Sequence, residues 1–216
     1  MPVLDSNKYA IALHTSTPQL GIAINNYAGD SRVRVWNLGR GLASELHSHL
    51  AQILAPQTWQ DIQFVAVAKG PGGFTGTRVG VVIARSIAQQ LDIPLYGISN
   101  LAAVAAANQH QDRHKQLLAV QMDARREQLF VGIYQSNERG LQAYMADTLM
   151  AKSDWQNILA NLTSPYQLIS AGDQIAHTVT NVLDLACIDW QQGKYPHWSE
   201  VLPYYGQHPV QGANGS

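Results

Sequence analysis

Apolar residues in the first third of the chain change from short runs to a helical repeat. Three short runs at residues 9–14, 20–24 and 32–36 predict a meander of strands. Leucine and isoleucine then recur at every third or fourth position from 42 to 54, which predicts an amphipathic helix. The chain therefore opens with three strands followed by a helix.

The next segment predicts a strand, a glycine-rich turn and further helices. Residues 64–68 form an apolar run, and a helical pattern covers 79–91. A short strand and an alanine-rich helix are expected at 95–98 and 101–107. The polar stretch at 108–116 then indicates a boundary between two units.

The second half repeats this order of elements. Two strands are expected on either side of an Asp-Ala-Arg-Arg turn, followed by a strand, a helix, a strand and a helix beyond Gly172. The expected ranges are 116–122, 128–134, 141–145, 154–162 and 166–170. We predict an α/β fold of two ribonuclease-H-like lobes, residues 1–107 and 108–216. The Gly- and Pro-rich tail after Pro203 is expected to be irregular.

Composition narrows the functional classes. The 216 residues are 46% hydrophobic and 13% charged, with a net charge of -1, so a nucleic-acid-coating surface is not expected. A single cysteine, Cys187, excludes an internal disulfide and a multi-cysteine zinc site. No signal peptide or membrane span is expected, so we predict a cytoplasmic protein without a membrane partner.

The glycine-rich turn is the main candidate for chemistry. A strand, a tight turn and a helix N-terminus together can bind an anion, because free backbone N–H groups and the positive end of the helix dipole point to one place. The P-loop pattern fails because Thr77 and Arg78 follow Gly76, and the dinucleotide pattern fails at Thr75. The turn is either a nucleotide cradle or a structural elbow, and its glycine content alone favours the elbow. The candidate residues of the turn are Gly70, Pro71, Gly72, Gly73, Thr75, Gly76 and Arg78.

Several motifs together carry a family resemblance. The longest is Val-Ala-Lys-Gly-Pro-Gly-Gly-Phe-Thr-Gly-Thr-Arg-Val-Gly at 67–80, followed by Ile-Pro at 93–94 and Gly-Ile-Ser-Asn-Leu at 97–101. Shorter pieces are His-Thr-Ser-Thr at 14–17, Asp-Ala-Arg at 123–125, Ala-Gly-Asp at 171–173 and Pro-Tyr-Tyr at 203–205. The chain resembles the TsaB (YeaZ) family, a two-lobed branch of the actin-like ATPase (ASKHA) fold.

The resemblance implies a function in tRNA modification. Members of the family assist synthesis of N6-threonylcarbamoyladenosine in tRNA as non-catalytic subunits that bind the catalytic paralogue TsaD. The resemblance also implies the ATPase TsaE as a further partner and tRNA binding through the assembled complex. Self-association as a homodimer is a further possibility. The complex uses ATP, whereas this chain would need no cofactor and would bind nucleotide weakly at most.

Two positions depart from the usual family pattern. The resemblance adds His14 and Thr15 to the candidate residues of the turn. His14 stands where the family usually has aspartate, and a histidine is a poor ligand for magnesium. Gly73 stands where serine is usual, which leaves the turn geometry feasible. The loss of the aspartate argues against phosphoryl chemistry.

Two rival functions are weighed against the scaffold. The first is an actin-like nucleotide-binding protein or ATPase that acts as a homodimer, and the change at His14 argues against it. The second is a protease. His47 and His49 diverge on their helix, and Cys187 lies in an apolar helix, so neither a metal nor a nucleophile constellation is found.

A stripe of small residues suggests a partner surface. Gly80, Ala84 and Ala88 recur every four residues, which would let another helix approach closely. These residues either pack on the first helix or meet a partner, and the resemblance favours TsaD or a second copy. The interface candidates are Leu46, His49, Leu50, Ile53, Gly80, Val82, Ala84 and Ala88.

The turn at Asp123 and Arg125 leaves two interpretations open. In one, these charged side chains hold the two lobes together or bind the partner. In the other, they are exposed on a hairpin turn.

Overall fold

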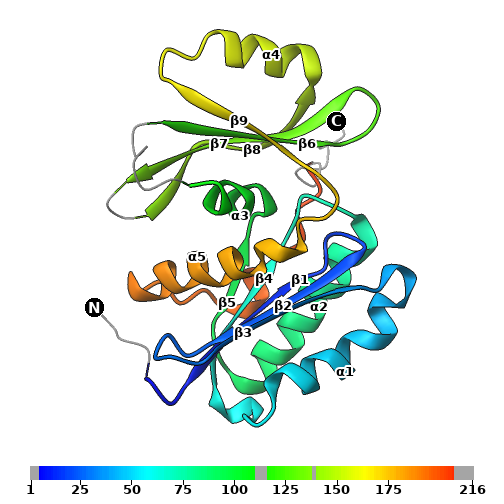
Figure 1. The fold of residues 1–216 in the computed structure, drawn as a ribbon, viewed down its shortest axis with the longest axis vertical. Coiled ribbons are helices and arrows are strands. Elements are labelled where there is room, and N and C mark those ends of the chain that lie inside the picture. Colours follow the sequence, from blue (N-terminus) through cyan, green and yellow to red (C-terminus); the bar gives the residue numbers. More distant parts are fainter. Residues whose placement is uncertain (1–4, 110–115, 138–139, 207–216) are drawn as a thin grey trace, which may run out of the picture.

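Two β-sheets with helices on their faces form the molecule (Figure 1). The computed structural model describes residues 5–109, 116–137 and 140–206. The first sheet has the strand order β3-β2-β1-β4-β5, and the second has the order β8-β7-β6-β9. The two-lobed α/β fold predicted from the sequence is confirmed.

The first sheet combines a meander with a parallel half. β1 pairs antiparallel with β2 and parallel with β4, β2 pairs antiparallel with β3, and β4 pairs parallel with β5. The strands are β1 (Tyr9–His14), β2 (Gln19–Asn25), β3 (Ser31–Asn37), β4 (Ile62–Ala68) and β5 (Leu95–Ile98). β1 is buried along its whole length because apolar side chains cover both faces of the sheet.

Helices cover both faces of this sheet. α1 (Leu42–Leu54) and α2 (Phe74–Leu91) pack on one face, and α5 (Val179–Gln191) packs on the other (Figure 1). Short 3₁₀ turns at Gly39–Gly41, Trp59–Asp61, Ala176–Thr178 and Trp198–Glu200 complete the connections. α2 begins at Phe74 rather than at 79, because the Thr77 N–H already donates to the Gly73 carbonyl.

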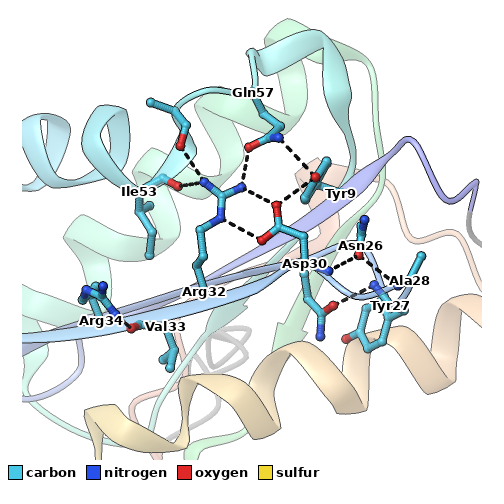
Figure 2. Close-up of polar contacts among 12 residues, drawn as sticks. Tyr9, Asn26, Tyr27, Ala28, Asp30, Arg32, Val33, Arg34, Ile53 and Gln57 are labelled. Atoms are coloured by element: carbon cyan, nitrogen blue, oxygen red, sulfur yellow. Dashed lines mark hydrogen bonds and ion pairs between the residues drawn. The ribbon is translucent and has the colours of Figure 1, made fainter.

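A polar cluster fixes the end of α1 to β3 (Figure 2). The Arg32 guanidinium donates to the carbonyls of Ile53 and Ala55, at 2.8 and 2.6 Å. It also pairs with Asp30 at 3.2 Å, and Gln57 accepts from it. Carbonyls at a helix C-terminus lack partners within the helix, so the hydrogen bonds from Arg32 satisfy them. Its positive charge also interacts favourably with the negative end of the helix dipole.

The second sheet is covered by a helix on each face. α3 (Asn100–Ala107) packs on the face toward the first sheet, and α4 (Lys152–Ala160) packs on the outer face (Figure 1). The strands are β6 (Leu117–Asp123), β7 (Gln128–Asn137), β8 (Gly140–Ala151) and β9 (Tyr166–Ala171). β8 continues six residues beyond the expected end at 145, since it pairs with β7 as far as Ala151.

The chain returns to the first sheet near its end. Val179, Val182 and Ala186 of α5 share a core with Ala10 and Ala66 of the first sheet. The division at 107 and 108 stays a prediction, and α5 shows that the second half also contributes to the first lobe. Most of the expected boundary, 110–115, and the last ten residues lie outside the described residues. None of the helices in the described part of the chain is long and apolar enough to cross a membrane.

Candidate functional site at the glycine elbow

The glycine-rich turn lies where three parallel strands end. It joins the end of β4 at Ala68 to the start of α2 at Phe74. Gly70 has a φ of +106°, a backbone conformation that favours glycine. The Asn100 N–H donates to the Gly70 carbonyl at 2.9 Å, and its side-chain amide donates to the Pro71 carbonyl at 2.7 Å. The elbow is thereby tied to the first turn of α3.

The elbow packs directly on the turn between β1 and β2. The Gly73 N–H donates to the Ser16 carbonyl at 2.7 Å, and the Thr15 hydroxyl donates to the Gly76 carbonyl at 2.8 Å. A Cβ atom at Gly72 would lie 2.6 Å from the Ser16 carbonyl oxygen. A Cβ at Gly76 would fall under 3.0 Å from the Thr15 carbonyl oxygen. These glycines let the chain's own backbone approach, which is what a structural elbow requires.

Gly80 extends the same contact along α2. A Cβ at this position would clash with the Thr15 hydroxyl oxygen. Thr75 and Arg78 are exposed on the helix, whereas Thr77 is buried. The small residues of the motif thus face the turn at Thr15 rather than an open cavity.

His14 is the residue that most changes the chemistry of the elbow. Its side chain is fully buried at the end of β1, and neither ring nitrogen has a hydrogen-bond partner among the described residues. Burial, with a smaller contribution from the nearby His177, lowers the pKa of His14 from 6.5 to about 3. The imidazole is therefore neutral at physiological pH.

The residues at the elbow do not fit a magnesium nucleotide. Magnesium prefers carboxylate oxygen, and His14 offers a neutral, buried ring instead. The space beside the glycines is taken by the backbone of Thr15 and Ser16. Among the described residues, no group of three His, Cys, Asp or Glu side chains could hold a metal ion. Weak nucleotide binding by this chain stays a prediction.

The C-terminal segment closes the other side of the elbow. The Tyr204 N–H donates to the Lys69 carbonyl at 2.7 Å, and the Tyr204 hydroxyl donates to the Asp147 carbonyl at 2.8 Å. A Cβ at Gly70 would clash with the Tyr204 carbonyl oxygen. Tyr204 thus connects the elbow of the first lobe to β8 of the second.

A partly buried carboxylate adds a second connection between the lobes. Asp147 on β8 accepts hydrogen bonds from the hydroxyls of Ser99 and Tyr134. Ser99 also caps α3 by accepting from the N–H groups of Leu101 and Ala102. Burial raises the pKa values of Asp147 and Tyr134. Sequence reasoning missed Asp147, since no local pattern pairs it with Ser99, forty-eight positions earlier.

Most of the expected partner residues are buried in this chain's own core. Gly80, Ala84 and Ala88 are buried, as expected for the alternative in which the stripe packs within this chain, and a contact with a partner stays a prediction. Gly80 has to be small because α2 approaches the turn at Thr15 closely there. The other buried candidates are Leu46, Leu50 and Ile53.

Two of the expected partner residues remain accessible. Val82 is 59% exposed on the outer side of α2. His49 is half-buried and stacks on Trp36 of β3, with ring centroids 4.3 Å apart. Of the two, Val82 is the better marker of a surface open to a partner. The interface itself stays a prediction.

Asp123 and Arg125 lie on the exposed turn between β6 and β7. Arg125, Arg126 and Glu127 have φ values of +68°, +49° and +58°, which are unusual for residues with a side chain. Glu127 forms an ion pair with Lys152 at 3.3 Å. The structure thus favours the exposed-turn interpretation, and a contact of Asp123 or Arg125 with a partner stays a prediction.

Comparisons with known proteins agree with this fold. The family model described as "TsaD: tRNA N6-adenosine threonylcarbamoyltransferase" matches residues 42–186. The chain is 38% identical over 106 residues to the tRNA threonylcarbamoyladenosine biosynthesis protein TsaB of Bacillus subtilis (strain 168), covering 49% of this chain and 45% of that protein. It is 35% identical over 81 residues to TsaB of Escherichia coli (strain K12), covering 38% and 35%.

A solved structure extends the likeness to almost the whole chain. YeaZ from Pseudomonas aeruginosa superposes with a TM-score of 0.72 at 19% identity, covering 92% of this chain and 100% of that one. The sequence matches cover less than half the length of the two curated relatives. With its two-sheet fold and glycine elbow, this chain belongs to the family of TsaD-like proteins, in its TsaB (YeaZ) branch.

Proposed function

We propose that this chain is a non-catalytic scaffold in the biosynthesis of tRNA N6-threonylcarbamoyladenosine. The relatives in Bacillus subtilis and Escherichia coli bear the name of that pathway. The observation that carries the non-catalytic role is the closed elbow, where the chain's own backbone lies against Gly72 and Gly76. The neutral, buried His14 supports the same conclusion.

The scaffold would act by binding the catalytic paralogue TsaD. A subunit without an active site activates another enzyme when it binds the competent conformation more tightly than the incompetent one. In this proposal TsaD transfers the threonylcarbamoyl group, TsaE supplies the ATPase, and tRNA is bound by the complex. This chain contributes a surface rather than a reacting group.

The outer side of α2 offers the best surface for that partner. Val82 is 59% exposed, and Thr75, two turns before it, and Ser86, one turn after it, are exposed on the same side. The exposed side of α1 presents the short side chains of Ala43 and Ala51. Both helices lie on the outside of the first sheet, so another helix could pack along them (Figure 1).

A substitution at Val82 tests this surface. Val82→Arg places a long charged side chain where a partner helix would approach, and the exposure of Val82 lets the chain itself fold normally. We expect the affinity for the TsaD of the same organism to fall about tenfold or more. The matched control is Gln156→Arg, an exposed position of α4 on the outer face of the second sheet.

Light scattering after size-exclusion chromatography measures the complex, and tRNA modification by the reconstituted components measures the function. Unchanged affinity of the Val82→Arg chain would contradict the proposed face. A wild-type chain that neither binds TsaD nor stimulates modification would contradict the scaffold. Magnesium-dependent nucleotide hydrolysis by the purified chain alone would contradict its non-catalytic role.

A further inference from the structure

A second exposed surface lies on the flank of α2 away from α1. α1 covers the half of the sheet formed by β2 and β3, whereas the C-terminal segment runs along the edge strand β5, where the Leu95 N–H donates to the Pro196 carbonyl. α2 lies between them and contacts the turn at Trp198–Glu200. The side chains on this flank form what we name the arginine–aromatic surface. It consists of Phe74, Arg78, Arg85, Trp198, Leu202 and Tyr205.

Ring contacts join five of these six side chains into two groups. The Arg78 guanidinium carbon lies 5.2 Å from the centroid of the Phe74 ring, and that ring packs against Tyr205 at 4.7 Å. The Arg85 guanidinium carbon lies 5.6 Å from the centroid of Trp198. Both arginines are therefore held over aromatic rings, which reduces the entropy that they would lose when they bind a partner.

Neither arginine has a carboxylate partner among the described residues. α2 carries no aspartate or glutamate between its first and last residue, so these two are its only charged side chains. Glu200 is the sole carboxylate in the segment from 195 to 206. The surface thus presents two unpaired positive charges.

Large apolar groups are exposed beside these charges. Phe74 and Leu202 are 56% and 60% exposed. Aromatic residues and arginine are enriched in protein interfaces, where a few such side chains carry most of the binding energy. Aromatic rings beside arginine can also stack on nucleotide bases, but the exposed Leu202 adds an apolar group that such stacking does not use. This composition favours a protein ligand over a nucleic acid.

We propose that the arginine–aromatic surface docks a segment of a protein partner that presents carboxylates beside an apolar side chain. The carboxylates would pair with Arg78 and Arg85, and the apolar group would cover Leu202 and Phe74. A second copy of this chain is a poor occupant, because a two-fold contact would place like charges opposite each other. Two arginines in a chain of net charge -1 also provide few phosphate contacts for RNA.

This inference rests on the proposed function, because the partner is taken to be a protein subunit of the same complex. It concerns the side of α2 next to Val82, because Arg78 and Arg85 are each one turn from Val82 along the helix. The crosslink at Leu202, which lies outside α2, tests this inference separately from the contact at Val82.

The experiment places a photo-crosslinking benzophenone amino acid at Leu202. The full chain is combined with purified TsaD, TsaE and tRNA of the same organism, irradiated, and the products are mapped by mass spectrometry. The same group at Tyr166, 37% exposed on β9, is the positional control. We expect a crosslink from position 202 to a carboxylate-bearing segment of a protein subunit, and none of that product from position 166.

Charge reversal provides the second measurement. The double variant Arg78→Glu, Arg85→Glu should reduce both the crosslink yield and the affinity for that subunit about tenfold or more. Arg34→Glu, at an exposed arginine of β3 on the opposite edge of the sheet, should change neither.

Four results would overturn the proposal. They are a crosslink to tRNA, a crosslink to a second copy of the chain, no crosslink in a complex that light scattering shows to be assembled, and unchanged affinity of the charge-reversed chain. If the wild-type chain binds none of the three components, both this inference and the proposed function fail. If it binds TsaD through the Val82 face without a crosslink at 202, this inference alone fails.

Discussion

The buried histidine at the end of β1 makes the stability of this protein depend on pH in a way that one substitution should remove. His14 is fully buried, and its ring nitrogens have no hydrogen-bond partner among the described residues. His14→Leu replaces the ring with an apolar side chain of similar size. At pH 8 the substitution should be close to neutral or mildly stabilising, because it removes buried polar atoms that are unsatisfied.

The sign of the pH effect follows from the direction of the pKa shift. The pKa of His14 is lowered from 6.5 to about 3 by folding, so the unfolded chain binds this proton more readily than the folded one. The wild-type protein therefore loses stability as the pH falls below 6.5, and the loss continues until about 3. At pH 5 the difference of about 1.5 pH units, at about 1.4 kcal/mol each, corresponds to about 2 kcal/mol.

Urea unfolding of both chains at pH 8 and pH 5, followed by circular dichroism, measures this difference. The free energy of unfolding of the wild type should fall by about 2 kcal/mol more than that of His14→Leu between the two pH values. Other titrating groups affect both chains equally and cancel. His47→Gln, at an exposed histidine of α1, is the control and should behave like the wild type. If wild type and His14→Leu show the same pH dependence, His14 is not held neutral by burial.

Three further substitutions test the packing of the elbow and of α2. Gly76→Ala should cost about 2 kcal/mol or more in thermal unfolding because its Cβ would clash with a carbonyl oxygen, whereas Gly172→Ala, with open space around it, should be nearly neutral. Tyr204→Phe should cost about 1 kcal/mol through loss of the hydrogen bond to the Asp147 carbonyl, and an unchanged melting temperature would contradict that contact. Ala84→Arg should unfold the first lobe, as circular dichroism would reveal, because Ala84 is fully buried. A variant that folds normally and only loses its partner would show that Ala84 points toward the partner instead.

The regular elements of the first lobe could be predicted because each follows a simple hydrophobic period. The leucine repeat from 42 to 54 gives α1 with the expected bounds, and the apolar runs at 9–14 and 95–98 give β1 and β5. The start of α2 was predicted too late. Gly76 was assigned to the turn because glycine lowers helix propensity, but contact with Thr15 requires a residue without a side chain there. Tertiary packing overrides propensity at this position.

The outward face of α2 could not be predicted for a different reason. Val81 and Val82 are neighbours in the sequence, yet the first is 1% exposed and the second is 59% exposed. Apolar residues surround most of this helix, so their period does not select the side that meets the sheet. From the sequence, the small residues could either pack within the chain or meet a partner. In the structure Gly80 meets the chain's own turn at Thr15, and Ala84 and Ala88 lie in the core. A stripe of small residues indicates close approach without identifying what approaches.

The same reasoning explains why the glycine motif alone could not separate a nucleotide cradle from a structural elbow. Both arrangements need backbone that comes close to another group, and glycine serves both because it lacks a Cβ atom. What separates them is the group on the other side of the glycines, and here Ser16 and Thr15 fill that space. His14, two positions before Ser16, also favours the structural elbow. Its buried, neutral ring is a poor ligand for magnesium, which prefers a carboxylate. The fold itself therefore requires a glycine motif of this kind, because the chain's own backbone packs against it.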